Sequence, residues 1–566
     1  MSGPVKVDVL VVGSGAAGLS AAVTAAMHGA SVMVAEKASV LGGTSAWSGG
    51  WLWIPRNPLA RAEGIDEAAD APLTYLQHEM GGEAADIRLQ TFLRYGPEMV
   101  EFFHQRTAVQ FLSGSAMPDF HPSPGAANGG RSVTAQPYDG RLLGDWLHRL
   151  RPPLETISMG GMGIAGGADM AHFFNATRSP RSALYAARRL LRHGWQRLRA
   201  GRGQHLVNGN ALVARLLRSA LDAGVRFQLN APVVRLLQGP PGVSGAVLRS
   251  DGGEIHVEAG AVVLACGGFP HDRQRLAQVV PHAAEGYGHF SAAPPDNQGE
   301  GIRLGESVGG QFDTSLRHPL AWAPVSRVTL ASGQQLMFPH LVERAKPGVI
   351  AVLPNGKRFV NEADSYHDFI AALLAATPAG DTPQAWLLAD RRTLRRYGLG
   401  HARPFPFTPT AWLRTGYLQR GNTLAELAKQ CAIDANALAE TVERFNHFAS
   451  TGEDVDFHRG ASAYNRAQGD HQVTLGPLRE GPFYAVRILP GSLGTFSGLQ
   501  TDEHARVLDE QQQPIPGLYA IGNDMSSVMR GYYPSGGITL GPAMTFGYLV
   551  GKNLAKKKTN INNNIT

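Results

Sequence analysis

The N-terminal unit of this chain constrains its fold more than any other part of the sequence. A near-continuous apolar run at 7–12 is typical of a parallel strand that is buried on both faces. It leads directly into a GxGxxG sequence at 13–18, and an alanine-rich segment at 19–28 is predicted to be helical. A second apolar run at 31–35 ends in Glu36. This order predicts an α/β chain that begins with a Rossmann-like dinucleotide-binding unit.

Each part of this unit has a physical role in binding a dinucleotide. Gly13 permits the tight turn, Gly15 lets backbone N–H groups approach the pyrophosphate, and Gly18 allows the helix to pack closely on the strand. The carboxylate of Glu36 follows eighteen residues after the last glycine, where it can accept a hydrogen bond from a ribose hydroxyl. We therefore expect this unit to hold a dinucleotide cofactor.

Three later segments favour a flavin over a nicotinamide as that cofactor. Small residues dominate 41–50, Leu-Gly-Gly-Thr-Ser-Ala-Trp-Ser-Gly-Gly, and permit close approach to a large flat ring system. The segment 260–268 is predicted to be another buried strand that runs into a glycine turn. The segment 517–524 ends in Asp524, just past a predicted strand end, where the carboxylate can bind ribityl hydroxyls. Together these segments predict FAD.

The chain also resembles the flavoproteins of the fumarate reductase and succinate dehydrogenase superfamily, apart from about 145–205 and the C-terminal tail. The segments 297–302 and 356–362 share this likeness. The resemblance implies non-covalent FAD, because Gly43 stands near the place of the attachment histidine of covalent members. The cofactor-binding residues predicted in this way are Gly13, Gly15, Ala16, Ala17, Gly18, Glu36, Lys37, Gly43, Thr44, Ser45, Ser48, Gly49, Gly50, Val233, Gly267, Asn523, Asp524, Gly537 and Leu540.

The length of 566 residues exceeds one compact core, so we expect two domains. The resemblance implies a Rossmann-like FAD-binding domain with an inserted α+β catalytic cap domain. The FAD-binding domain is predicted at 1–280, with a basic helical insertion at about 145–205, and at 481–555. These two parts must combine, since the glycine unit and the acid after the last strand meet at one FAD. The cap is predicted at 281–480, and the polar tail 556–566 is predicted to be disordered.

A glycine-rich segment near the C-terminus, residues 531–548, carries the strongest indication of chemistry. Tyr533 is followed by Ser535, by two glycines and by a segment predicted to be helical, 543–555. This order directs a phenol hydroxyl and the free N–H groups of a helix N-terminus to one point. Such a point stabilises an oxygen that becomes negative during a reaction.

The same segment resembles the C-terminal signature of the 3-ketosteroid dehydrogenase branch, Tyr-Pro-x-x-Gly followed by Leu-Gly-Pro-Ala-Met-Thr-Phe-Gly-Tyr. The resemblance implies that the Tyr533 hydroxyl and the Gly537 N–H hold the ketone oxygen of the substrate. It also implies that Tyr366, which follows an Arg-Phe-Val-Asn-Glu segment, removes the proton. An ordinary tyrosine titrates near about 10, so Tyr366 must be activated by its neighbours to act as a base.

Two positions depart from the 1-ene-forming members of this branch. Phe120 stands where those members carry a further tyrosine that supports the base, and we expect Phe120 in the substrate pocket. Ser535 resembles the serine of 4-ene-forming relatives that assists proton relay, although a serine in a glycine-rich turn needs no catalytic reason. Both positions leave open a different ring position or a smaller ketone.

The sequence therefore predicts an FAD-dependent dehydrogenase that forms a carbon–carbon double bond next to a ketone, foremost the 1-ene of a 3-ketosteroid. Its alternatives are a 4-ene-forming enzyme, a smaller cyclic ketone dehydrogenase, and a reductase that acts on an enone or fumarate. Fumarate chemistry is disfavoured, because the region 530–537 holds one arginine and no histidine. A non-catalytic FAD-binding subunit is the remote alternative. We expect a quinone, an artificial dye or another acceptor to take the electrons.

Arginines concentrate in one segment of this chain, whose net charge is +6. The eight arginines from Arg178 to Arg202 are interleaved with leucines and a tryptophan, which predicts a basic amphipathic helix. We favour a solvated or subunit-packing helix over peripheral contact with an anionic membrane. No nucleic-acid-binding module and no metal-ligand spacing is recognised. Two cysteines and the absence of a basic leader favour a cytoplasmic protein, peripherally membrane-associated in the alternative.

Overall fold

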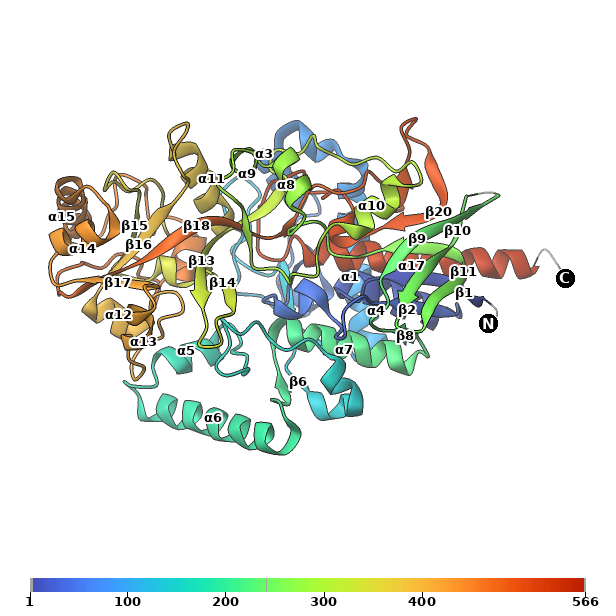
Figure 1. Ribbon diagram of the computed structural model, residues 1–566, viewed down its shortest axis with the longest axis horizontal. Helices are drawn as coiled ribbons and strands as arrows, with labels where there is room; N and C mark the ends of the chain where they lie inside the picture. Colours follow the sequence, from blue (N-terminus) through green and yellow to red (C-terminus); the bar gives the residue numbers. More distant parts are fainter. Residues whose placement is uncertain (1–3, 241, 564–566) are drawn as a thin grey trace.

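The structure, a computed structural model, describes residues 4–240 and 242–563. Two large β-sheets lie next to each other along the long axis of the molecule, each with its own helices (Figure 1). The first sheet is built from both ends of the chain and the second from its middle. The α/β class predicted from the sequence is confirmed.

The first sheet has a core of five parallel strands in the order β20-β11-β1-β2-β8. The apolar residues of β1 (Val5–Val12) and β2 (Val32–Ala35) form strands because both faces of the sheet are covered, and every residue of β2 is buried. Val12 pairs with Ala35 on one side and with Leu264 on the other. The glycine turn after β1 and the acid after β2 therefore emerge at one edge of the sheet.

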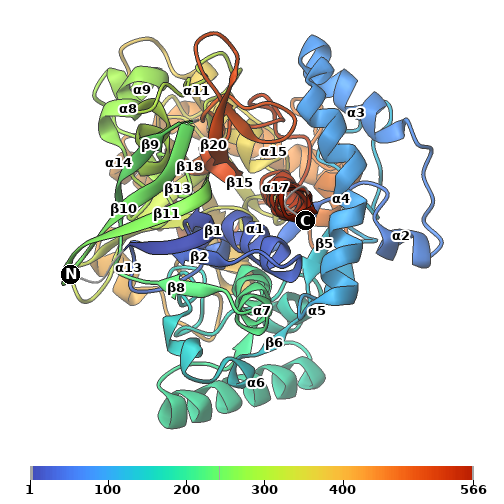
Figure 2. The ribbon, with the colours of Figure 1, turned by 90° about the vertical axis from the view of Figure 1, so that its right-hand side faces the viewer.

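Helix α1 (Ala16–Met27) follows the glycine turn, as predicted, and packs between α17 (Leu540–Asn563) and α7 (Asn208–Asp222), as Figure 2 shows. Small residues permit this close packing. A Cβ atom added at Gly547 or Gly551 of α17 would lie 2.6 or 2.7 Å from a backbone oxygen of α1. The alanines of α1 and the glycines of α17 thus let the two helices approach until their backbones touch.

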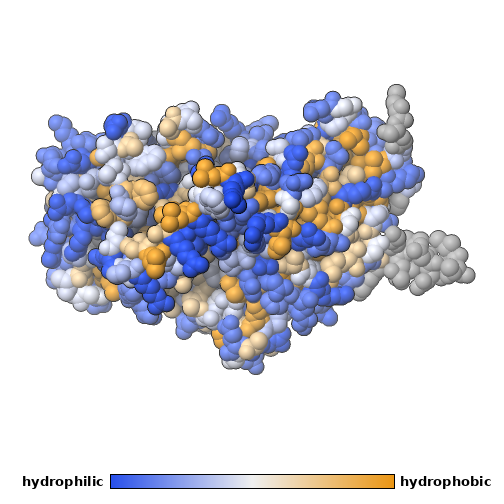
Figure 3. All heavy atoms as spheres, turned by 90° about the horizontal axis from the view of Figure 1, so that it is seen from below, coloured by the Kyte–Doolittle hydropathy of each residue, from blue (hydrophilic) through white to orange (hydrophobic). Residues whose placement is uncertain are grey.

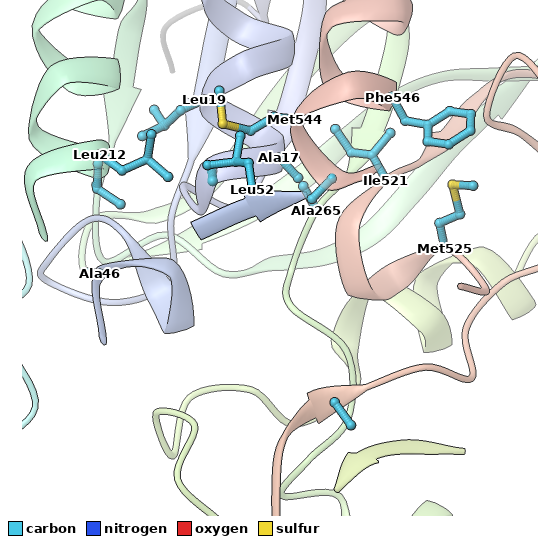
Figure 4. Close-up of a cluster of buried hydrophobic side chains, with 14 of the residues drawn as sticks. Ala17, Leu19, Ala46, Leu52, Leu212, Ala265, Ile521, Met525, Met544 and Phe546 are labelled. Carbon is cyan, nitrogen blue, oxygen red and sulfur yellow. The ribbon is translucent and has the colours of Figure 1, made fainter. Parts of the chain in front are cut away.

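The core beneath these helices joins segments from the whole length of the chain. Figure 4 shows Leu19 of α1, Leu212 of α7 and Met544 of α17 converging, with Leu52 and Ile521 next to them. These five side chains are all fully buried. The packing fixes the two ends of the chain against each other and thereby holds the edge where the glycine turn emerges.

The second sheet is largely antiparallel, in the order β14-β13-β18-β16-β15. Its central strand, β18 (Phe483–Thr495), pairs with β13 (Leu320–Thr329) on one edge and with β16 (Ala385–Asp390) on the other. Helix α11 (Tyr366–Ala376) packs against β13, while α15 (Ala435–Thr451) contributes to a separate apolar core on this sheet. This packing places the N-terminus of α11 between the two sheets.

The second sheet changes one predicted domain boundary. The sequence assigned residues from 481 onward to the FAD-binding part, but β18 lies at the centre of the second sheet. Hydrogen bonds on both of its edges prevent β18 from belonging to another unit, so the boundary moves past Thr495. The short helix α10 (Glu300–Glu306) also departs from the predicted division, because it returns to pack on β9 and β11 of the first sheet.

The predicted basic insertion contains two helices that project from the lower side of the molecule in Figure 1, α5 (Ala168–Phe174) and α6 (Pro180–Ala200). At the other end of the chain, α17 continues to Asn563, so the described part of the tail predicted to be disordered is helical. Lysine is a good helix former, and extending an existing helix is easier than nucleating one. Residues 564–566 lie outside the described part of the chain.

The remaining elements complete these layers and connect them. The other strands are β3 (Trp51–Trp53), β4 (Phe111–Ser113), β5 (Ser132–Ala135), β6 (Tyr138–Asp139), β7 (His205–Leu206), β8 (Arg226–Gln228), β9 (Val233–Gly239), β10 (Gly242–Ser250), β11 (Gly253–Leu264), β12 (Phe290–Ser291), β14 (Gln335–Pro339), β15 (Val349–Val352), β17 (Leu418–Gly421), β19 (Arg506–Leu508) and β20 (Pro514–Ala520). The other α-helices are α2 (Pro58–Ala62), α3 (Ala71–Met80), α4 (Ile87–Arg106), α8 (Arg273–Val279), α9 (Pro281–Ala284), α12 (Arg391–Tyr397), α13 (Thr410–Arg414), α14 (Leu424–Cys431) and α16 (Ala463–Gln468). Among the described residues, no helix combines the length and the apolar character that crossing a bilayer requires.

Candidate functional site

A cavity of about 1130 Å³ lies between the two sheets and is lined by residues from both. The first sheet contributes its glycine turns and the loops that follow β2 and β11. The second sheet contributes the end of β18 and the first residue of α11. The cavity thus joins segments that are hundreds of residues apart in the chain.

Most of the predicted cofactor-binding residues line this cavity. They are Gly13, Gly15, Ala16, Ala17, Glu36, Lys37, Gly43, Thr44, Ser45, Ser48, Gly49, Gly50, Val233, Gly267, Asn523, Gly537 and Leu540. Two predicted residues, Gly18 and Asp524, lie behind the lining instead.

The glycine turn has the steric and hydrogen-bonding properties that a pyrophosphate requires. A Cβ atom on Gly13 would lie 2.2 Å from the Ala265 carbonyl oxygen, and one on Gly18 would lie 2.1 Å from the Gly13 carbonyl oxygen. Both positions therefore exclude any side chain. The N–H groups of Gly15 and Ala17 donate to no acceptor among the described residues, so they remain free at the N-terminus of α1.

The acid after β2 is fixed at the same place by neighbouring polar groups. The Glu36 carboxylate accepts hydrogen bonds from the Ser14 hydroxyl at 2.6 Å and from the Ala38 N–H at 2.9 Å. The Ser45 hydroxyl accepts from the Ala16 N–H at 3.0 Å, and Lys37 pairs with Glu300. These contacts hold the lining of the cavity rigidly around the glycine turn.

Asp524 lies behind the lining of the cavity. Its carboxylate is fully buried and accepts the N–H groups of Cys266 and Gly268 at 2.6 and 2.9 Å. Burial raises its pKa to about 6. The carboxylate thus holds the turn after β11, which places Gly267 against the cavity. Contact of Asp524 with cofactor hydroxyls stays a prediction.

Four aromatic rings gather at another wall of the cavity. Phe120 stacks on Tyr533 with ring centroids 5.7 Å apart, and Tyr366 meets Tyr533 edge to face at 5.1 Å. Tyr464 lies against Phe120 at 4.4 Å. All four rings line the cavity, so Phe120 is where the sequence predicted it. The wall presents three phenols and one ring without a hydroxyl.

The two predicted catalytic phenols are in direct contact. The Tyr366 hydroxyl donates to the Tyr533 hydroxyl at 2.7 Å. Burial raises the pKa of both phenols, to about 12 for Tyr533 and well above its ordinary value for Tyr366. Both are therefore protonated at neutral pH. The Gly537 N–H donates to no acceptor among the described residues, and Gly537 lines the same cavity.

Ser535 does not join this group, although the sequence placed it among the catalytic candidates. It is buried, does not line the cavity within the described part of the chain, and lies next to Asp119. Tyr533, Gly536 and Gly537 line the cavity, whereas the Ser535 hydroxyl lies against the Asp119 carboxylate. A role for Ser535 in proton relay stays a prediction.

A charged group that was not predicted from the sequence lies behind the aromatic wall. His121 lies between the carboxylates of Glu79 and Asp368, at 2.5 and 2.8 Å, and hydrogen bonds to both raise its pKa to about 10 even though burial opposes this. This protonated histidine follows Phe120 directly, and Asp368 lies two residues after Tyr366. The ion pair therefore fixes the two aromatic residues relative to each other. The signal available in the sequence was that charged residues, His121 and Asp368, lie close to the predicted residues Phe120 and Tyr366.

The far end of the cavity also escaped prediction. Met170, Phe173 and Phe174 of α5 and Leu190 of α6 line it, and this part is apolar. Arg403 lines the cavity as well, with its guanidinium donating to the Ser158 carbonyl. Tyr464 has no local signature either, because it reaches the wall from a segment 98 residues after Tyr366.

Comparisons with known proteins agree with this geometry. The family model for the FAD binding domain matches residues 8–540. Among curated proteins, the 4-oxocyclohex-2-ene-1-carboxylate 5-dehydrogenase of Sinomonas cyclohexanicum is 40% identical over 97% of this chain and 94% of its own length. The 3-oxosteroid 1-dehydrogenase of Mycolicibacterium smegmatis is 36% identical over 97% of both chains.

A solved structure is similar over the whole fold. The crystal structure of 3-ketosteroid delta1-dehydrogenase from Sterolibacterium denitrificans in complex with 1,4-androstadiene-3,17-dione matches with a TM-score of 0.88 and 36% identity. The match covers 98% of this chain and 100% of that one. The glycine turn, the cavity and the likeness over nearly the full length lead to one conclusion. The chain belongs to the FAD binding domain family, in its 3-ketosteroid dehydrogenase branch, and is an FAD-dependent oxidoreductase.

Proposed function

We propose that this enzyme removes two hydrogens from neighbouring carbons next to a ring ketone and so forms a conjugated double bond. The contact between the Tyr366 and Tyr533 hydroxyls in the cavity, beside the free N–H of Gly537, carries this proposal. A C–H bond next to a ketone becomes acidic only when the carbonyl oxygen is stabilised as an enolate. The cavity offers hydrogen-bond donors for such an oxygen, Tyr533 and Gly537, and a group that can take the proton, Tyr366.

Tyr533 and Gly537 are the proposed donors to the ketone oxygen. Each preorganised donor in an oxyanion site contributes about 3–4 kcal/mol to lowering the barrier. The Tyr366 hydroxyl already donates to the Tyr533 oxygen, which polarises the Tyr533 O–H toward a further acceptor. While Tyr366 is neutral, this hydrogen bond strengthens the one that Tyr533 would donate to the substrate; the tyrosinate form of Tyr366 no longer donates it.

Tyr366 is the proposed base for the proton on the carbon next to the ketone. Its raised pKa means that the neutral phenol dominates at pH 7, and only a small tyrosinate fraction is competent. That fraction grows tenfold with each pH unit. The reaction is therefore expected to accelerate in alkaline solution.

The residues along the glycine turn are proposed to bind FAD non-covalently. The free N–H groups of Gly15 and Ala17 would hold the pyrophosphate, and Glu36 would accept from the ribose. Bound FAD supplies the acceptor for the hydride that leaves the neighbouring carbon. Gly43 lines the cavity near the position of the attachment histidine and offers no nucleophile. Acid denaturation should therefore leave the yellow cofactor in the supernatant, and a yellow pellet would contradict this.

A 3-oxosteroid, converted to its 1-ene, is the proposed substrate. The second-sheet unit is proposed to act as the catalytic cap. The apolar far end of the cavity, lined by Met170, Phe173 and Phe174, suits a large multi-ring ketone. The solved relative was captured with a 1,4-diene-3-ketosteroid, which supports the same assignment. Electrons are proposed to leave to a quinone or another soluble acceptor.

A second candidate is an oxocyclohexane carboxylate, because a relative with 40% identity is named for such a substrate. Arg403 and Lys346 line the cavity and are the cationic groups available to a carboxylate there. Burial lowers the pKa of Lys346 to about 8, so its charge is already marginal in weakly alkaline solution. The Arg403 guanidinium is therefore the stronger candidate.

A product-identified assay distinguishes the two substrates. The FAD-loaded enzyme is supplied with an artificial acceptor and either a 3-oxosteroid or 4-oxocyclohexanecarboxylate, and products are identified by mass and by the position of the double bond. The proposal predicts a 1-ene steroid at the higher kcat/KM. Faster turnover of the carboxylate, reduced by Arg403→Gln, would establish the second candidate. Turnover of neither ketone would reject the proposed reaction.

A further inference from the structure

Helix α6 carries an apolar stripe that no described part of the chain covers. Leu184, Leu191, Trp195 and Leu198 recur at intervals of seven, four and three residues, which places them on one face of the helix. These side chains are between 57% and 85% exposed. The opposite face, which includes Ala186, is buried against the protein. The arrangement is the reverse of an ordinary surface helix, whose apolar face turns inward.

Arginines accompany the stripe along one flank. Arg181, Arg188, Arg192 and Arg199 follow the same helical periodicity and are exposed. Among the described residues, no carboxylate pairs with them within ion-pair distance, and no acidic residue occurs between Asp169 and Asp222. The Arg199 guanidinium lies over the Trp195 ring at 4.3 Å, so the flank and the stripe are in contact. The exposed surface of α6 therefore combines apolar side chains with arginines that form no ion pair with a described carboxylate.

Other arginines of the segment have structural roles, in contrast to the four flanking arginines. Arg189 pairs with Asp169 at 2.8 Å, and Arg202 donates to the carbonyls of Leu147 and Leu150. These guanidiniums attach the insertion to the protein. The four flanking arginines make no such attachment. Figure 3, which views the molecule from the side where α6 projects, shows hydrophobic side chains interspersed with strongly hydrophilic ones over this region.

The cavity reaches the surface beside the same helix. Leu190 of α6 lines the cavity and is 41% exposed. Phe405 and Phe407 of the loop before α13 also line the cavity, and about half of each side chain is exposed. The opening is therefore bordered by apolar side chains next to the exposed stripe.

We propose that α6 docks the enzyme on an anionic membrane surface and that the apolar ketone reaches the cavity from that side. The stripe would enter the boundary between headgroups and acyl chains, where leucine and tryptophan are stabilised. The arginines would lie at the level of the phosphates, and each strengthens binding to an anionic surface about fivefold. Access of a ketone from the bilayer rests on the proposed function, whereas the docking itself does not.

The charge on the helix selects a membrane over a second copy of this chain. An isologous pair would bring the four flanking arginines of each copy near those of the other, and the helix offers no acid to compensate them. Negative lipid headgroups match both parts of the surface at once. Anionic lipid is therefore the occupant with complementary charge.

Sedimentation with vesicles tests the docking on the FAD-loaded enzyme. Wild type should bind phosphatidylglycerol–phosphatidylcholine vesicles and bind phosphatidylcholine vesicles far less. The variant Leu184→Ser/Leu191→Ser/Leu198→Ser should bind the anionic vesicles at least tenfold more weakly, with an unchanged FAD absorbance spectrum. A control, Ile87→Ser/Leu112→Ser/Val455→Ser, removes three apolar residues elsewhere that are about half exposed and should bind like wild type.

Charge substitution and turnover refine the result. Arg181→Gln/Arg188→Gln/Arg192→Gln should weaken binding to anionic vesicles about a hundredfold. The serine variant should turn over a vesicle-borne ketone more slowly but a water-soluble ketone at the wild-type rate. Equal vesicle binding by the serine variant and the control overturns the proposal. The proposal is also overturned if wild type forms a dimer but binds no vesicles, and the serine variant abolishes that dimer. Vesicle binding needs no turnover, so failure of the proposed reaction leaves the docking result intact.

Discussion

The cofactor end and the aromatic end of the cavity are constructed in opposite ways. At the glycine turn the lining is backbone and small side chains, with free N–H groups at Gly15 and Ala17. At the aromatic wall the lining is large rings from four separate segments. Backbone can contact a cofactor shared by many enzymes without specifying a substrate. Side chains can be exchanged without disturbing the sheet, so they are suited to determine which ketone reacts.

The two ends should therefore fail differently when they are altered. A side chain added at the glycine turn would overlap backbone atoms, and it would therefore impair binding of the whole cofactor. A change at the wall removes one functional group and leaves the fold.

The largest effect is expected from Gly18→Ala. The added Cβ would lie 2.1 Å from the Gly13 carbonyl oxygen, so the turn must shift and the pyrophosphate site is lost. We expect FAD occupancy below about a tenth of wild type and no turnover. Gly194→Ala is the matched control, because no atom lies within 4 Å of its added Cβ. Full FAD occupancy in Gly18→Ala would show that the glycine turn does not determine cofactor binding.

The next effect is expected from the phenols, with the cofactor retained. Tyr533→Phe should reduce turnover by about 10²–10³, as in oxyanion-site deletions. Tyr366→Phe removes the proposed base and should reduce turnover by about 10²–10⁴. Both variants should keep the FAD spectrum, and the neighbouring Tyr532→Phe should resemble wild type in stopped-flow flavin reduction.

Ligand binding separates the roles of the two phenols. A non-reactive ketone should bind more weakly to Tyr533→Phe, which loses a ground-state hydrogen bond, and almost normally to Tyr366→Phe. Weakening confined to Tyr366→Phe would reverse the two assignments. Unimpaired turnover in both variants would remove the phenols from the mechanism.

A pH profile of kcat/KM should show the ionisation of Tyr366. Because burial raises the pKa of this phenol above its ordinary value, the tyrosinate fraction grows about tenfold per pH unit throughout the range below 10. The wild-type profile should rise with that slope and reach no plateau below pH 10. The profile of Tyr366→Phe should be flat. A wild-type profile that falls with rising pH contradicts a tyrosinate base.

The smallest effect concerns the ion pair behind the wall. His121 has a folded-state pKa of about 10, above its ordinary value, so its stabilisation is complete below about pH 6.5 and is lost as pH rises through 10. His121→Gln should lower the free energy of unfolding by about 1–2 kcal/mol at pH 7, after allowance for partial exposure. The difference from wild type should vanish near pH 11 in thermal denaturation. The exposed His256→Gln should have no effect at either pH.

Much of the cofactor end could be predicted from the sequence because its information is local. The glycines of residues 13–18 and the acid at Glu36 lie within one strand–helix–strand unit, whose spacing is set by the geometry of parallel strands. The C-terminal turn was predictable for the same reason, since Tyr533 and Gly537 are four residues apart. Ser535 shows the limit of such inference, because it lies between Tyr533 and Gly537 in the sequence and yet does not line the cavity with them.

The aromatic wall and the far end could be predicted only in part because their contacts are between distant segments. Tyr464 reaches Phe120 from more than 300 residues away, and no local pattern records that meeting. Asp524 was placed correctly near a strand end, but its partners are two peptide N–H groups that the sequence does not reveal. The boundary at 480/481 was wrong for the same reason, since pairing on both edges of β18 depends on strands far away.

The hydrogen bond between Tyr366 and Tyr533 joins two separate bodies of the molecule. Tyr366 begins a helix packed on the second sheet, and Tyr533 precedes the helix that packs against α1 on the first. A movement of one sheet relative to the other that displaces this point by a few ångströms would separate the two hydroxyls beyond hydrogen-bond distance. The hydrogen bond between the two hydroxyls therefore depends on how the two sheets are placed relative to each other.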